Sequence, residues 1–122
     1  MKKLILALLC LLFTSGYSVY KFSHPGAVVT YSINTNRLCI GSTYKSDILT
    51  YYYFGSFGTG NTVTISEENN DAIDLSYPNN CLKITLKPEL KYVVLYIQNQ
   101  KHYSYRFKTA PDGTITKLKP GE

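Results

Sequence analysis

Short runs in which apolar and polar residues alternate, separated by turn residues, fill most of the chain after Ala27. The clearest run is Cys81–Leu86, where Leu82, Ile84 and Leu86 fall on one side of an extended strand and the residues between them are polar. A period of two predicts half-buried β-strands, and a helical period is hardly present anywhere. The chain is therefore predicted to be all-β.

The strands are expected where such runs are bounded by Gly, Pro, Asn or Asp. They are expected at residues 27–33, 37–42, 47–57, 62–66, 81–86, 92–98 and 102–108, with short edge strands at 72–76 and 114–118 and an acidic loop at 67–71. The most apolar run, 92–98, should be central. Turns about every 8 to 12 residues predict a single antiparallel two-sheet sandwich of about seven strands.

One corner of that sandwich carries a recognisable spacing. The segment from Leu86 through Pro88 to Tyr92 reads Leu-x-Pro-x-x-x-Tyr and resembles the corner between the fifth and sixth strands of fibronectin type III and related immunoglobulin-like domains. The resemblance implies that the sandwich is immunoglobulin-like or fibronectin type III-like. The resemblance implies that the Tyr92 hydroxyl bonds back to the upstream backbone. Glu89 stands where those domains usually have glycine, and an ordinary core tyrosine after a proline turn is the alternative.

The first eighteen residues have the pattern of a secretory signal peptide. Lys2 and Lys3 precede the apolar run Leu4–Phe13, and small residues follow at Gly16 and Ser18. We therefore expect a signal peptide at 1–18, an N-terminal extension at 19–26, the sandwich at 27–118 and a tail at 119–122. The apolar run is shorter than the roughly 20 residues that cross a bilayer, so no transmembrane segment is expected after processing.

The position of the cysteines bears on localisation. A bacterial lipoprotein needs a cysteine at the cleavage site, whereas Tyr17 follows the suitable small residues and Cys10 lies inside the apolar run. A soluble periplasmic protein is therefore expected. Processing leaves Cys39 and Cys81, which should form a disulfide in an oxidising compartment. Both lie near the starts of their strands, so Cys81 should precede the regular pairing, or the strands should be staggered.

Charge and motifs exclude several classes of function. The net charge of +5 falls to +3 without Lys2 and Lys3, too little and too dispersed for a nucleic-acid binder. His24 and His102 are far apart, so no metal site follows from spacing. No catalytic or cofactor-binding motif is present, and an enzyme is not expected.

The aromatic run in the third predicted strand is the candidate binding feature. Alternation sends Tyr52 and Phe54 to one side, and Tyr51, Tyr53 and Phe57 to the other. The outward set would suit a protein interface, with basic residues such as Lys45 meeting an acidic partner. Two alternatives stay open: neighbouring strands or lysine stems could cover this set, or the tyrosines could stack on sugar rings.

The arrangement of the two cysteines and the strand after the corner resembles the family of type VI secretion immunity proteins. The segments that carry the resemblance are Arg37–Ile40, Asn80–Leu82 and the strand from Pro88 to Tyr96. Members of this family are small periplasmic proteins and often lipoproteins. The resemblance spans residues 28–108 and implies stoichiometric binding of a protein toxin in the periplasm, without a cofactor. Tyr17 departs from the lipoprotein pattern. An adhesin-like or carbohydrate-binding sandwich module is the alternative.

Overall fold

The computed structural model describes residues 22–58, 62–69 and 74–119, and these form eight strands. The predicted signal peptide, the first three residues of the N-terminal extension and the end of the tail lie outside them. The strands are β1 (Val29–Ser32), β2 (Arg37–Ile40), β3 (Leu49–Phe57), β4 (Val63–Asn69), β5 (Cys81–Lys83), β6 (Lys91–Gln98), β7 (Lys101–Thr109) and β8 (Ile115–Lys117).

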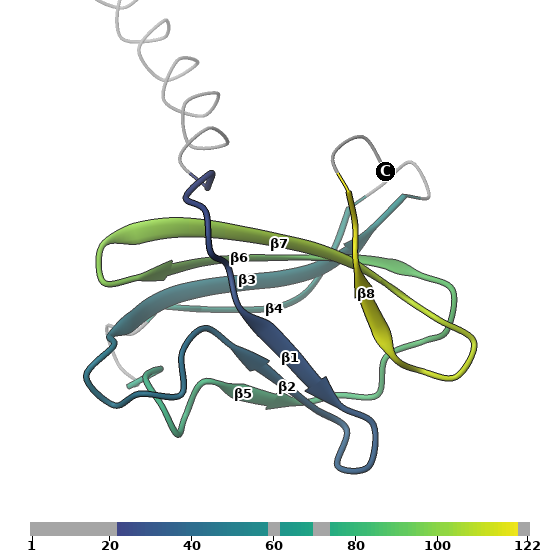
Figure 1. Ribbon diagram of the computed structural model, residues 1–122, viewed down its shortest axis with the longest axis horizontal. Coiled ribbons are helices and arrows are strands. Elements are labelled where there is room, and N and C mark those ends of the chain that lie inside the picture. Colours follow the sequence, from purple (N-terminus) through teal and green to yellow (C-terminus); the bar gives the residue numbers. More distant parts are fainter. Residues whose placement is uncertain (1–21, 59–61, 70–73, 120–122) are drawn as a thin grey trace, which may run out of the picture.

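The strands form two antiparallel sheets that pack face to face (Figure 1). The smaller sheet has the order β1-β2-β5, and the larger has the order β4-β3-β6-β7-β8. The predicted all-β antiparallel sandwich is confirmed, and β6 is the central strand of the larger sheet. In constant-type immunoglobulin domains the fourth strand pairs with the fifth. Here β4 pairs with β3 instead.

The core lies between the inner faces of the two sheets. Alternate residues of β6, beginning with Tyr92, are buried, as strand geometry requires. The Tyr92 ring stacks on both Phe54 and Phe107, with 5.4 Å between centroids in each pair. Leu38 and Ile40 enter the core from β2. Burial of each such side chain contributes about 1.5–3 kcal/mol to the free energy of folding. Because these side chains come from both sheets, their burial holds the sheets together.

Two local predictions near β4 are wrong. Glu67–Asn69 was expected in a loop but continues β4, because its backbone pairs with β3 and places Glu67 opposite Tyr53. The described end of the predicted edge strand 72–76 is not a strand. There the Ser76 amide donates to the Asp74 carboxylate at 2.9 Å, and the Ser76 hydroxyl accepts from the Leu49 amide at 3.1 Å.

Cys39 and Cys81 form the predicted disulfide. They lie directly opposite each other on β2 and β5, with Cα atoms 4.0 Å apart. Cys81 therefore belongs to the regular pairing and the strands are not staggered, so both expectations are wrong. The reason is that Cys39 is the third residue of a four-residue strand, whereas Cys81 begins its own. The neighbouring Ile40 amide donates to the Asn80 carbonyl at 2.8 Å, which makes the cysteines a non-hydrogen-bonded pair.

The chain crosses from the smaller to the larger sheet through residues 84–90. The Lys87 amide donates to the Tyr92 hydroxyl at 3.0 Å, which is the bond of a tyrosine corner. Leu86 is buried just before the turn, and Pro88 lies exposed within it. Thr109 of β7 holds the same turn, because its hydroxyl donates to the Lys87 carbonyl at 2.6 Å. The corner is thus fixed from two sides.

Candidate functional site

The outward aromatic residues of β3 lie together on the solvent side of the larger sheet. We call this surface the outer face; its apolar members are Tyr51, Tyr53, Phe57, Val93, Leu95 and Ile97. The register sets Tyr51 opposite Ile97 and Tyr53 opposite Leu95, so β3 and β6 supply two adjoining rows. The smaller sheet covers only the opposite, inner side, and every member of the outer face is half-buried by its neighbours.

The N-terminal segment reaches one end of the outer face. The Phe22 ring lies 5.2 Å from His102 and 6.2 Å from Tyr51, measured between ring centroids. The segment is held there because the His24 amide donates to the His102 carbonyl at 2.9 Å. His102 lies on the solvent side of β7 and is half-buried beside Phe22.

The two long sides of the outer face differ in charge. On the β4 side the Tyr51 hydroxyl donates to the Glu67 carboxylate at 2.5 Å. Burial, followed by this bond to Glu67, raises the pKa of Tyr51, so the phenol keeps its proton at neutral pH. On the β7 side Lys91 lies directly opposite Lys108, and the Arg106 guanidinium lies 4.6 Å from the Phe57 ring centroid. The face thus has an acidic margin and a basic margin.

Lys45 does not join the aromatic set. It lies in the loop between β2 and β3, near three exposed large apolar side chains: Tyr44, Ile48 and Tyr77, with exposed fractions of 71%, 55% and 40%. We call this region the loop end. It holds a hollow of about 440 Å³, lined by Lys45, Ile48, Asp74, Ser76, Tyr77 and Pro78.

Hydrogen bonds from the strand ends fix the loop end. The Asn99 side chain accepts from the Ile48 amide at 2.8 Å and donates to the Asp47 carboxylate at 2.9 Å. Hydrogen bonds from Ser42 and Asn99 lower the pKa of Asp47. The side-chain amide of the buried Asn80 donates to the Ile40 carbonyl at 2.9 Å. The loop therefore presents its exposed side chains from a fixed backbone.

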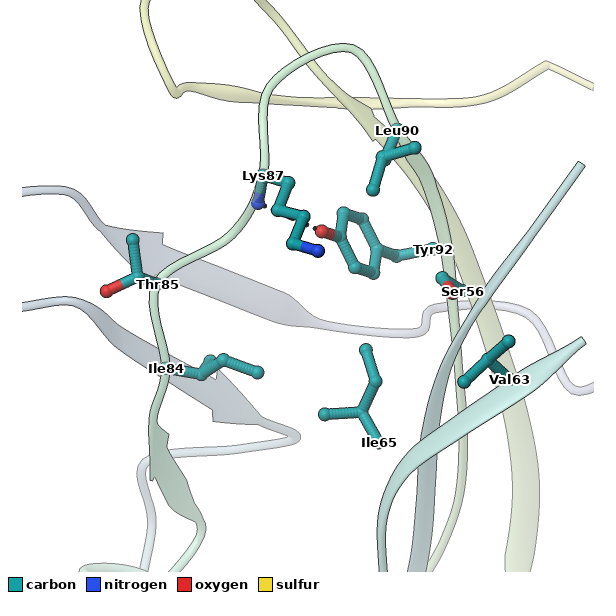
Figure 2. Close-up of a pocket in the computed structure, with 8 residues that line it drawn as sticks. All are labelled: Ser56, Val63, Ile65, Ile84, Thr85, Lys87, Leu90 and Tyr92. Atoms are coloured by element: carbon teal, nitrogen blue, oxygen red, sulfur yellow. Dashed lines mark hydrogen bonds between the residues drawn. The ribbon is translucent and has the colours of Figure 1, made fainter. Parts of the chain in front are cut away.

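A third feature is an apolar groove between the edge strands β4 and β5. Figure 2 shows Ile65 and Ile84 directed toward each other from the two sheets, with the Tyr92 hydroxyl bonded to Lys87 at the far end. The groove has a volume of about 290 Å³. Val63 and Ile65 are exposed along its rim. Both strands end their sheets here, so no described strand pairs with their free edges.

Sequence reasoning located part of these surfaces. It placed Tyr51, Tyr53 and Phe57 on one side of β3, because side-chain alternation is a local property. It missed Tyr44, Ile48 and Tyr77, whose loops meet only in the folded chain. The available signal was an aromatic residue within the small, polar segment 41–47, a composition common in binding loops.

No group of three or more His, Cys, Asp or Glu residues able to hold a metal ion occurs in ranges 22–58, 62–69 and 74–119. Within those same ranges, no helix is long and apolar enough to cross a membrane. No protein-family model matches the chain, and no curated protein or solved structure matches it at a significant level.

Proposed function

We propose that this protein is a non-catalytic, exported binding protein that neutralises a toxin in the periplasm by stoichiometric binding, as an immunity protein does. The observation that carries the proposal is the outer face, two adjoining rows of aromatic and aliphatic side chains on a sheet surface that the smaller sheet does not cover. Half-buried aromatic side chains on an uncovered sheet face can supply contact area to a protein partner, and tyrosine is enriched among residues that dominate binding energy.

The charges around the face indicate the kind of partner. Lys91 and Lys108 lie opposite each other across neighbouring strands, and the Arg106 guanidinium lies next to Phe57, so this side of the face carries basic residues. Acidic groups on a partner would complement that charge. The toxin surface is therefore proposed to be apolar at its centre, opposite Tyr53, and acidic on the side that meets β7.

The test is coexpression in the periplasm with each secreted toxin encoded beside this gene. Protection by the wild-type protein is expected, and Tyr53→Ala should weaken toxin binding about thirtyfold, the effect of losing about 2 kcal/mol. Tyr44→Ala removes an exposed tyrosine from the loop end and serves as the matched control. Absence of protection by folded wild-type protein would refute the immunity function. Protection that survives alanine at Tyr51, Tyr53 and Phe57 would move the contact elsewhere.

A second candidate is a carbohydrate-binding module, which the loop end favours. Tyr44 and Tyr77 expose rings that could stack on sugars, and the hollow beside Lys45 and Asp74 offers polar groups for hydroxyls. This function would be supported if the protein is retained on immobilised glycans, Tyr77→Ala abolishes the retention and Tyr53→Ala leaves it unchanged. Toxin binding that Tyr53→Ala weakens and Tyr77→Ala leaves unchanged would support the immunity function.

A further inference from the structure

The disulfide lies on the solvent side of the smaller sheet. Leu38 and Leu82 are opposite each other and turn toward the core, so Cys39 and Cys81, which are their neighbours in the two strands, turn away from it. Both cysteines are half-buried. Cys81 lies on β5, the edge strand of the sheet, whose free side meets no other described strand. A reagent in solution can therefore approach Cys81 from the edge.

Two cations flank the disulfide on the same side of the sheet. Arg37 and Lys83 lie directly opposite each other, each two residues from a cysteine and therefore on the same side of its strand. Both side chains are exposed, and no hydrogen bond or ion pair of either side chain is found within the described residues. The strands β1, β2 and β5 contain no Asp or Glu, so no carboxylate of this sheet offsets the two charges.

We propose that Cys39–Cys81 is a thiol–disulfide exchange site for small anionic thiols, at which Arg37 and Lys83 attract the incoming thiolate and stabilise the departing sulfur. Exchange proceeds by thiolate attack, and its rate rises when the leaving sulfur carries its negative charge more easily. Cations beside a sulfur have that effect. The position at an open edge supplies access, and the two cations supply selectivity for negative thiols.

The step is a two-electron reduction of the protein. A thiolate attacks Sγ of Cys81, the bond between the two cysteine sulfurs breaks, and its electron pair leaves on Cys39, which takes a proton from water. Cys81 then carries a mixed disulfide. A second thiolate attacks the reagent's sulfur in that mixed disulfide and releases Cys81 as a thiolate. Two thiols are oxidised to one disulfide, while the protein gains two thiols.

The test measures reduction of the oxidised protein by two small thiols of opposite charge, 2-mercaptoethanesulfonate and cysteamine. Mass spectrometry after acid quenching follows the mixed disulfide and the free thiols. Each rate constant is divided by that of the same thiol with a neutral peptide disulfide. The normalised ratio should favour the anionic thiol. Removal of each cation should change the rate of the anionic thiol about threefold, because that is the effect of a unit charge about 7 Å from the reacting sulfur in water.

The variants separate local charge from net charge. Arg37→Gln with Lys83→Gln should bring the ratio close to that of the peptide, whereas Lys101→Gln with Lys117→Gln, an equal loss of charge from the larger sheet, should leave it unchanged. Arg37→Lys with Lys83→Arg keeps both charges and should keep the ratio. In the wild-type protein, 0.5 M salt should reduce the preference, because surface charges are screened. Equal normalised rates for both thiols, or no response to salt, would overturn the proposal.

Discussion

The Lys87 amide and the Tyr92 hydroxyl are joined by a hydrogen bond of 3.0 Å at the point where the chain passes from one sheet to the other. Tyr92 is only 3% exposed, and its ring lies in the stack that joins the sheets. The same side chain thus fills the core with its ring and fixes the crossover with its hydroxyl. A substitution that removes only the hydroxyl tests the second role alone.

Tyr92→Phe should lower the free energy of unfolding by about 1–3 kcal/mol, because the Lys87 amide loses its partner while the ring stays in place. Urea denaturation of both proteins measures the difference. Tyr105→Phe, at a half-buried tyrosine of β7, is the control and should have a smaller effect. A loss within about 0.3 kcal/mol, below the value of one hydrogen bond, would contradict the role of the hydroxyl.

Glu89 adopts φ of 58°, a left-handed conformation that costs a residue with a Cβ about 1–2 kcal/mol and costs glycine almost nothing. Glu89→Gly should therefore leave stability unchanged or raise it by up to about 1 kcal/mol, after allowing for the greater freedom of glycine when unfolded. Glu89→Val should lower stability, because branched residues tolerate this region poorly. The opposite order of the two variants in thermal unfolding would show that another interaction of Glu89 dominates.

The disulfide closes a loop with a sequence separation of 42. Replacing both Cys39 and Cys81 with alanine should lower stability by about 4 kcal/mol, the value that the chain-entropy model gives for such a loop. Protein purified without reductant after expression with export to the periplasm should contain no free thiol when titrated under denaturing conditions. Two free thiols per molecule would contradict the disulfide.

Stability should fall in alkaline solution as the tyrosines ionise. Burial raises the pKa of Tyr51, Tyr52, Tyr96 and Tyr105, so the folded chain holds protons that the unfolded chain releases near pH 10. The resulting stabilisation is complete below that pH and is lost as the pH rises through the folded values. Urea denaturation between pH 8 and pH 11 should show this fall, and Tyr51→Phe should make it shallower. Tyr44→Phe is the exposed control, and equal slopes in both variants would contradict the assignment to Tyr51.

The parts of the fold that depend on local pattern could be predicted. Side-chain alternation separated Tyr52 and Phe54 from the outward aromatics, and the proline spacing located the turn before Tyr92. The pairing of Glu67–Asn69 with β3 could not be predicted, because acidic and amide side chains suit an edge strand as well as a loop. Nor could the bond from Thr109 to Lys87, which joins residues separated by 22 positions without any local signal.

The candidate surfaces also differ in whether local sequence or the folded arrangement of distant segments brings their residues together. Tyr51, Tyr53 and Phe57 share a surface because they share a strand. Lys45 was grouped with them on charge alone, and the fold places it at the loop end, since residues of different loops are brought together only by the pairing of distant strands. The exposed Tyr77 is an example, because its position beside Ile48 depends on how the segment before β5 returns to the sheet.

The larger sheet is bounded by two unequal strands, β4 with seven residues and β8 with three. Among the strands that the structure describes, only β4 offers a long row of free backbone donors and acceptors to another chain. If two copies joined along β4, each would use its long edge, and the described strands of the pair would present no comparable edge to a third copy. Association of this kind closes with two-fold symmetry, whereas fibres need two usable edges in every subunit. Unequal edges of this kind would thereby protect the protein from open-ended polymerisation.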